Sequence, residues 1–421
     1  MRARVQNGLR CGLIAVAVVL PLLMWRGAMD TTDVAAAAAT TVSVAKAHYV
    51  GSQSCERCHA DAYNGWKQTR MARVIQDPRE HPEAVLGDFA HPNPLVKFGL
   101  DDVAFVYGTR YKQRYFTKKG DDYYVQPAQW DVQKKKWLPF HVEKGTDWWV
   151  PFYGESNFER PTGPLCDGCH SVNYDIATKK VTEWNVGCER CHGPGSDHVA
   201  HPSRTNIVNP DKLNSVAGND VCIQCHSQGQ PLGNPIAGKY YDWPVGYEPG
   251  KNLADYWKLE ELKPGETNFY QYADLTAHKN RMQGNDFVQS NMYHREIRCF
   301  DCHQVHSNQN ESNLIARGNA LCLSCHTAAN PAGLKGTVPE HTHHAENSAG
   351  SQCVACHMPL IAHTLKDSFV ASHTFRFISP AQTKQSGIPN PCTSCHTDKT
   401  NDWALKELRT WKTTSPWRVA E

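Results

Sequence analysis

The feature that most constrains this chain is the pentapeptide Cys-x-x-Cys-His, which occurs eight times in 421 residues. Two copies, at residues 166–170 and 188–192, are separated by only seventeen residues. This spacing is the attachment signature of a c-type haem, in which two thiols add to the haem vinyl groups and the adjacent His binds the iron. The sequence therefore predicts eight covalently attached haem c groups.

Each copy supplies two attachment cysteines and one proximal iron ligand. The predicted attachment residues are Cys55, Cys58, Cys166, Cys169, Cys188, Cys191, Cys222, Cys225, Cys299, Cys302, Cys322, Cys325, Cys353, Cys356, Cys392 and Cys395. The predicted proximal ligands are His59, His170, His192, His226, His303, His326, His357 and His396.

The cysteine count argues against the two common alternatives. Of 17 cysteines, sixteen lie in the eight motifs and the seventeenth, Cys11, lies near the N-terminus. Zinc sites and disulfide frameworks also use many cysteines, but neither requires His directly after every second Cys. The pattern therefore favours haem attachment, and once the N-terminal leader with Cys11 is removed, the mature chain is expected to have no thiol left over for a disulfide or a nucleophile.

The N-terminus is typical of an export signal. Arg2, Arg4 and Arg10 precede an uncharged apolar run at residues 11–25, which is shorter than the roughly 20 residues that span a membrane. Residues 1–47 are interpreted as a signal peptide and linker with an open cleavage point, and a retained membrane tether is the alternative. Because haem c is attached outside the cytoplasm, a periplasmic or otherwise exported location is expected.

Residues 48–421 are expected to form a single multihaem domain. They provide roughly 47 residues for each haem, too few for eight separate cores, so closely packed porphyrins should supply much of the core. The predicted fold class is mainly α with extensive loops, wrapped around eight covalent haems, with a small antiparallel β-meander insert.

Two long stretches carry no motif. The first contains a β-rich insert at about residues 85–160, where apolar residues alternate in three or four strands separated by charged turns. The second runs over about residues 227–298 and is expected to contain a helix at 253–262, before Pro264 and Gly265. A last helix is expected at 402–411.

The sixth ligand of each iron separates an electron carrier from an enzyme, since only an open iron can bind substrate. Fourteen histidines lie outside the motifs, enough for full bis-His ligation. Those closest to motifs are the candidate distal ligands: His198, His294, His306, His343, His344 and His373.

Several segments resemble a known family. YVGSQSCERCHADAYNGWKQTR, GCERCHGPGSDH, CVACHMP and PNPCTSCHTDKTNDWALKEL are similar to multihaem cytochromes of the cytochrome c-554-like group, which is related in haem packing to hydroxylamine oxidoreductase and the pentahaem nitrite reductases. The resemblance implies parallel and perpendicular haem pairs, mostly bis-His ligation and a periplasmic electron-transfer role.

Two departures from the family matter. The nitrite reductases carry Lys in place of the motif His at their active haem, whereas all eight motifs here have His. Relatives often carry His where this chain has Met71, twelve residues after His59. Met71 could bind that iron, pack beside it, or leave the site open.

The expected function is electron transfer along closely packed haems. The alternatives are an octahaem oxidoreductase that acts on a small nitrogen or sulfur oxyanion at one open haem, and a subunit of an extracellular conductive filament. Expected partners are other cytochromes or quinol-linked membrane complexes, and an oligomer is compatible with the sequence. A formal net charge of +2, offset by haem propionates, does not favour nucleic acid.

Overall fold

The described residues of the computed structural model are 46–140, 161–232, 241–307, 312–331, 333–365, 368–412 and 418–419. The expectations for a signal peptide and a membrane tether therefore concern residues that lie almost wholly outside this part. Contacts define Ala47–Glu421 as a unit of its own, and the following description concerns that unit.

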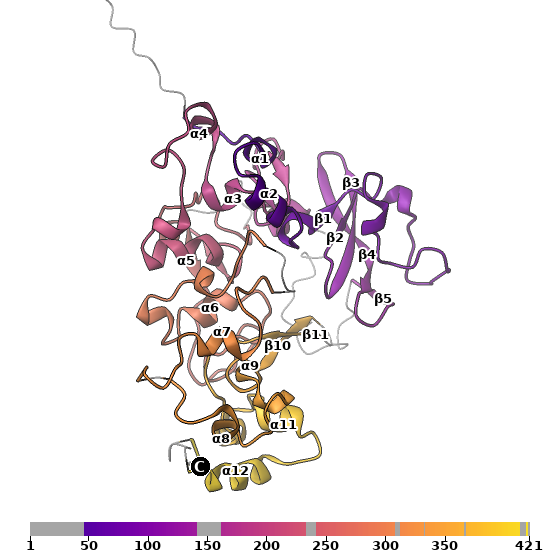
Figure 1. The fold of residues 1–421 in the computed structure, drawn as a ribbon. Coiled ribbons are helices and arrows are strands. Elements are labelled where there is room, and N and C mark those ends of the chain that lie inside the picture. The colour runs from indigo at the N-terminus through magenta and orange to yellow at the C-terminus, as the bar shows by residue number, and fades with distance from the viewer. Residues whose placement is uncertain are drawn as a thin grey trace, which may run out of the picture. The chain divides into compact units, whose positions relative to one another are not determined.

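Short helices joined by loops make up most of the unit (Figure 1). The α-helices are α1 (Gln53–Glu56), α2 (Ala60–Lys67), α3 (Glu189–His192), α4 (Ser196–Ala200), α5 (Ser215–Ile223), α6 (Gln283–Phe287), α7 (Asn319–Leu323), α8 (Val338–Thr342), α9 (Cys353–His357), α10 (Pro380–Ser386), α11 (Pro391–Cys395) and α12 (Asn401–Thr410). Single 3-10 turns are η1 (Met71–Arg73), η2 (Pro82–Ala84), η3 (Leu100–Asp102), η7 (Pro210–Lys212), η8 (Leu253–Asp255), η9 (Tyr293–Arg295), η10 (Cys299–Asp301) and η11 (Ala349–Ser351), and η6 (Gly163–Asp167) is a π turn.

Helix content is modest, so "mainly α" overstates the helices, while the loop-rich character and the small antiparallel sheets agree with expectation. The predicted C-terminal helix is present as α12, one residue earlier than expected. Thr400 caps it by accepting a hydrogen bond from the Trp403 amide, and Ala404, Leu405 and Leu408 form its buried face.

The first haem-free stretch forms an antiparallel meander of five strands in chain order: β1 (Ile75–Gln76), β2 (Phe105–Tyr107), β3 (Lys112–Lys119), β4 (Asp122–Asp131) and β5 (Lys136–Pro139). The sequence predicted three or four strands, and the additional one is β1. With only two residues, β1 is too short to show an alternation of apolar and polar residues. One face of the sheet buries Val103, Val106, Tyr115, Ala128, Trp130 and Trp137. Across the pair β3–β4, Lys112 Nζ lies 2.6 Å from Asp131 Oδ2, with 5% and 2% of these side chains exposed.

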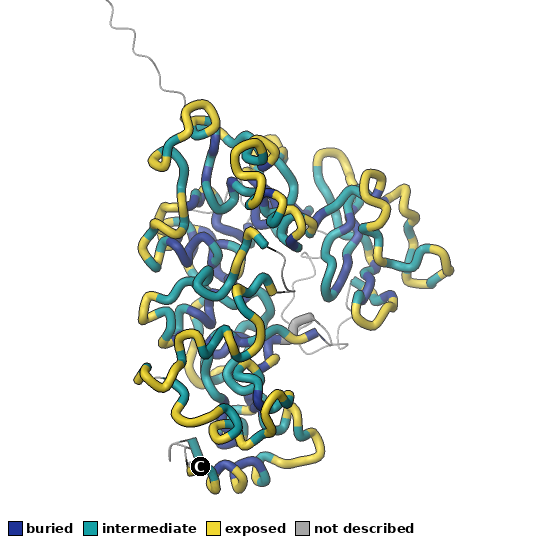
Figure 2. The backbone as a smooth tube through the Cα atoms, viewed as in Figure 1, coloured by how far each residue is buried: buried dark blue, intermediate teal, exposed yellow. Residues whose placement is uncertain are grey.

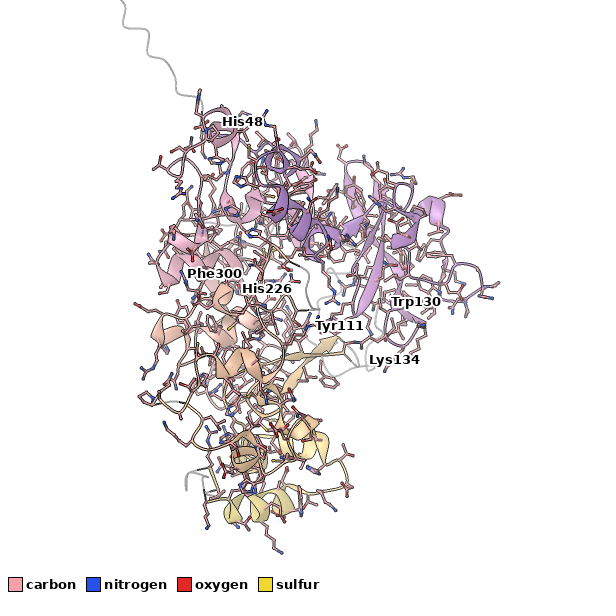
Figure 3. All side chains as sticks on the ribbon, in the orientation of Figure 1. His48, Tyr111, Trp130, Lys134, His226 and Phe300 are labelled. Carbon is pink, nitrogen blue, oxygen red and sulfur yellow. The ribbon has the colours of Figure 1, made fainter. Side chains whose placement is uncertain are left out.

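The sheet contacts the segment that joins the second and third motifs. Asn185 accepts a hydrogen bond from the Ile75 amide (2.7 Å) and donates one to the Ile75 carbonyl (2.9 Å). Phe105 packs on Trp184 at a ring-centre distance of 5.1 Å. Buried residues, dark blue in Figure 2, lie in both the sheet and the helical part, and Figure 3 marks Trp130 in the first and His226 in the second.

The expected helix at residues 253–262 is wrong. One 3-10 turn, η8, is followed by strand β9 (Trp257–Leu259), which pairs antiparallel with β8 (Gly229–Pro231). The indole of buried Trp257 donates to the Ser227 hydroxyl at 3.1 Å, so tertiary contacts decide the local structure. The remaining small sheets are β6 (Ser171–Val172) with β7 (Glu183–Trp184), and β10 (Leu360–Leu365) with β11 (Ser368–Ala371).

Candidate functional site: coupled cysteine motifs and opposed histidines

Every motif, numbered one to eight in chain order, folds as a single helical turn. The motif His donates its backbone amide to the carbonyl of the first Cys, at 2.9 Å for His59 and 2.8 Å for His396. Residues three and four apart share one face of such a turn. The two thiols and the imidazole therefore point to the same side, as attachment to one porphyrin requires.

Three pairs of motifs are joined through their first cysteines. The thiols of Cys55 and Cys188, of Cys222 and Cys299, and of Cys322 and Cys353 lie within hydrogen-bonding distance. These contacts join motif one to three, four to five, and six to seven.

The same type of hydrogen bond, from a backbone amide to a side chain, supports each of these pairs. The residue three positions before the first Cys of one motif accepts a hydrogen bond from the amide of the first Cys of the other. Asn219 accepts from the Cys299 amide, Asn319 from the Cys353 amide and Ser52 from the Cys188 amide, each at 2.8 Å. Asn219 and Asn319 also donate to a carbonyl of the partner segment. A local sequence position thus fixes a long-range pairing.

The remaining links involve second cysteines. The thiols of Cys169 and Cys225 lie within hydrogen-bonding distance. Cys191 lies within electrostatic range of Cys222 and Cys225, Cys302 of Cys325, and Cys356 of Cys395. The cysteines therefore connect the motifs in the order one, three, four, five, six, seven, eight, and motif two branches from motif four.

Four motif histidines face a second histidine at a characteristic distance. Their ring centres are 6.1–6.3 Å apart, and the ring planes differ by 15–33°. The pairs are His59 with His198, His192 with His306, His357 with His341, and His396 with His344.

This distance fits an iron held between two imidazoles. Rings in direct stacking contact are about 3.5–4 Å apart, so the pairs leave room for an atom between them. A bond of about 2 Å from each nitrogen and a ring radius of roughly 1 Å place the ring centres roughly 6 Å apart. The residues present therefore fit bis-His haem, a group that supplies reversible one-electron chemistry.

Several of these rings are oriented by a hydrogen bond at Nδ1, the ring nitrogen that would not bind the iron, as is usual for metal-ligating histidine. Nδ1 of His192 lies 2.7 Å from the Val208 carbonyl oxygen, and Nδ1 of His198 lies 3.0 Å from that of Ser203. This arrangement leaves Nε2 of each ring available for a metal. Burial lowers the pKa of His192, which favours the neutral form that binds iron.

The other sequence candidates lie in different environments. His343 stacks directly on Trp411 at 4.3 Å, and it is His341, which the sequence did not single out, that faces a motif His. His294 is exposed and packs edge-on against Tyr293. His373 directs Nδ1 to the Ala371 carbonyl at 3.0 Å.

The residue opposite His59 of motif one comes from a distant segment of the chain and not from a neighbouring residue. The position opposite His59 is occupied by His198, a candidate distal ligand that lies just after motif three in the sequence. Met71 begins η1, and its carbonyl accepts a hydrogen bond from the Val186 amide. The segment that carries His306 packs directly on α2 at Gly65. A Cβ at this position would lie 1.9 Å from the His306 carbonyl oxygen, so only glycine allows the approach.

Motif two has a distinctive environment. His170 Nδ1 is buried and has no hydrogen-bond partner among the described residues, and Tyr107 of β2 meets the ring edge-on at 4.8 Å. Burial, reinforced by the nearby cations of Arg281, Arg190 and Arg114, lowers the pKa of His170 to about 3. The second insert contributes Arg281, whose guanidinium donates to the Asp242 carbonyl at 3.2 Å.

Within the described ranges, no three His, Cys, Asp or Glu side chains converge to hold a metal ion by themselves. The arrangement thus lacks the closed set of four protein ligands that structural zinc uses. Among the same residues, no helix has the length and apolarity needed to cross a membrane.

Comparison with known proteins defines the class. The doubled CXXCH motif family matches residues 294–331, which include motifs five and six. A dissimilatory sulfite reductase, MccA, from Wolinella succinogenes is 24% identical over 327 residues, covering 61% of this chain and 41% of the relative. The chain thus spans about two fifths of that relative's length.

Among solved structures, the outer cell wall cytochrome OcwA superposes with a TM-score of 0.70 and 23% identity, covering 86% of this chain and 87% of that one. This likeness establishes the shared fold. Together with the motifs, it identifies the chain as a multihaem c-type cytochrome.

Proposed function

We propose that this cytochrome carries eight covalent haems and passes electrons along them in the order one, three, four, five, six, seven, eight. The observation that carries the proposal is the continuous series of neighbouring motif cysteines, alternately within hydrogen-bonding distance and within electrostatic range of one another. Because each thiol would hold a porphyrin edge, neighbouring thiols would bring the edges of successive porphyrins close together. Cys58, Cys325 and Cys395 are exposed, so motifs one and eight at the two ends, and motif six between them, suit exchange with partners.

The ligand assignments follow from the opposed rings. We propose that His198, His306, His341 and His344 are the distal ligands for motifs one, three, seven and eight. His373 lies within electrostatic range of His226 and His303, and its orientation suits a ligand of motif four or five.

His343 and Met71 are then packing residues, and His294 remains a surface residue. We further propose an exported location with other cytochromes or quinol-linked complexes as partners. The outer-cell-wall location in OcwA's description and the extracytoplasmic attachment of haem c support export.

Intact-mass measurement combined with electron paramagnetic resonance tests the proposal. We expect a mass increment of eight haems and low-spin ferric signals from motifs one, three, seven and eight. Fewer than eight haems would contradict the proposal. A high-spin signal that is present while His341 and His198 are intact, and that is lost when only the opposed motif histidines His357 and His59 are changed, would also contradict it.

A second function is favoured at motif two. We propose that its iron reduces a small sulfur or nitrogen oxyanion, a class that includes the substrate in the sulfite reductase relative's name. Three arginines lie within electrostatic range of His170, and Tyr107 lies against its ring. Cations attract an oxyanion, and Tyr107, on the side of the proximal ligand, would orient the His170 ring. The branch position would supply electrons from motif four.

The test is carbon monoxide binding to the reduced protein, together with oxidation of reduced viologen by sulfite and nitrite. We expect one haem to bind carbon monoxide and one anion to be reduced. Arg281→Gln should raise KM for that anion, while Arg57→Gln, at an exposed arginine, should not. A carbon-monoxide-inert protein with no turnover refutes this second function and leaves electron transfer intact.

A further inference from the structure

A single short stretch, residues 372–376, meets the axial ligands of two haems and is termed the ligand segment. It contains His373, the proposed distal ligand of motif four or five, whose Nδ1 lies 3.0 Å from the Ala371 carbonyl oxygen. The Phe375 carbonyl accepts a hydrogen bond from the ring of His357, the proximal ligand of motif seven. The conformation of this one segment therefore bears on the ligands of two irons.

The ligand segment has a backbone conformation that its sequence does not favour. Phe375 has a φ of 54°, in the left-handed region that is strained for a residue with a bulky side chain. Its ring lies edge-on to two others, with ring-centre distances of 6.2 Å to Phe287 of α6 and 5.9 Å to His373. Such a conformation persists only where the surrounding structure fixes it, so other parts of the chain must hold this segment.

Asp286 of α6 holds the N-terminal side of the ligand segment. Its Oδ2 accepts hydrogen bonds from the Ser372 hydroxyl at 2.8 Å and from the His373 amide at 3.0 Å, and its Oδ1 accepts one from the Ala277 amide at 2.7 Å. Asp286 is only 2% exposed, and hydrogen bonds to a charged acceptor are the strong ones. The carboxylate therefore fixes the backbone from which the His373 imidazole projects.

Arg376 holds the C-terminal side of the ligand segment. Its Nη2 donates hydrogen bonds to the Asp274 carbonyl at 3.2 Å and to the Thr276 hydroxyl at 3.1 Å. These two acceptors and α6 all belong to the second haem-free stretch. The same stretch thus holds the ligand segment on both sides of Phe375, through hydrogen bonds between residues 86 to 102 positions apart in the chain.

We infer that Asp286 and Arg376 are positioning residues for axial ligation at two haems. By fixing the ligand segment, they direct His373 to the iron of motif four or five and direct the Phe375 carbonyl to His357 at motif seven. A hydrogen bond at the second ring nitrogen orients a ligating histidine and raises its basicity. The second haem-free stretch, which carries no attachment motif, thereby acts on the irons through their ligands. This inference rests on the proposed assignment of His373.

Electron paramagnetic resonance of the ferric holoprotein, with the haem count checked by intact mass, tests the role of Asp286. In Asp286→Ala the His373 amide loses its acceptor, so one haem should change from low spin to high spin. Gln271→Ala is the matched control in the same stretch. Gln271 is 1% exposed and hydrogen-bonds through its side chain to the backbone of Lys263 and Glu266 at 2.6–3.1 Å, so this variant should lose stability and keep the wild-type spectrum.

Spectroelectrochemical titration of Arg376→Gln tests the second contact. Without the guanidinium, the Phe375 carbonyl should move away from His357, and the imidazole becomes a weaker donor to its iron. A weaker donor stabilises ferric iron less, so the reduction potential of one haem should rise. If the potentials of all haems match those of the wild type, Arg376 has no positioning role.

His373→Ala separates this inference from the ligand assignment on which it rests. A wild-type spectrum for His373→Ala overturns the assignment. One high-spin haem in His373→Ala, together with a wild-type spectrum for Asp286→Ala or a high-spin haem in Gln271→Ala, overturns the positioning role alone. If Asp286→Ala does not mature, Ser372→Ala removes one of the two hydrogen bonds to Oδ2. Its high-spin signal should then appear at a lower guanidinium chloride concentration than in the wild type, and equal midpoints refute the role.

Discussion

Asn219 offers a direct test of how the motifs are coupled. Its side chain is fully buried, accepts a hydrogen bond from the Cys299 amide at 2.8 Å and donates one to the Ile297 carbonyl at 3.1 Å. In Asn219→Ala both backbone groups lose their partner. Each unsatisfied group costs about 1–3 kcal/mol when fully buried. Because both hydrogen bonds are only part-buried, we take the lower half of the range, and local stability should fall by about 2–3 kcal/mol.

Hydrogen exchange read by mass spectrometry measures this change. At 1.4 kcal/mol per factor of ten, exchange of the Cys299 amide should accelerate roughly 30- to 150-fold. Asn214→Ala is the matched control on the same helix. It removes only the cap of α5, a hydrogen bond from the Ala217 amide at 2.9 Å, and should cost about 1 kcal/mol without exposing Cys299.

Asn319→Ala gives the reciprocal control, since Asn319 accepts from the Cys353 amide. It should accelerate exchange at Cys353 and leave Cys299 unchanged. The coupling argument is refuted if Asn219→Ala leaves Cys299 protected, or if Asn214→Ala deprotects it equally.

Two further predictions concern other parts of the chain. Asp131→Asn leaves Lys112 buried without its partner and should destabilise the sheet by about 3–5 kcal/mol, measured as accelerated amide exchange in β3 and β4. Burial raises the pKa of Asp131, but the hydrogen bond and charge of Lys112 and the amides of Lys134 and Gln133 together outweigh it, so the net pKa is lowered. This stabilisation is therefore present above about pH 4 and is lost as pH falls through the folded pKa. His341→Ala should convert one ferric haem to high spin in paramagnetic resonance, whereas His343→Ala should retain the wild-type spectrum, and equal spectra for the two variants would refute the assignment.

The sequence by itself determined the cofactor class, because the two attachment cysteines and the proximal histidine of each haem lie within five consecutive residues. Two thiols and an imidazole on one helical turn need no distant partner to be recognised. Alternation in β2 to β4 and the apolar face of α12 were similarly readable, since both are local periodicities. The helix expected at 253–262 failed because pairing of Trp257–Leu259 with β8 overrides local propensity.

Only the tertiary structure decided which histidine faces which motif. His198 lies opposite His59 across 139 positions of the chain, and His341 rather than His343 faces His357. Sequence proximity cannot rank such partners, because they meet through packing of distant segments. The two CERCH pentapeptides show that identical local sequences can have different surroundings. Identical in sequence, they leave Arg57 exposed and Arg190 partly buried, with the Nε and Nη2 atoms of Arg190 shielded from solvent by distant segments of the fold.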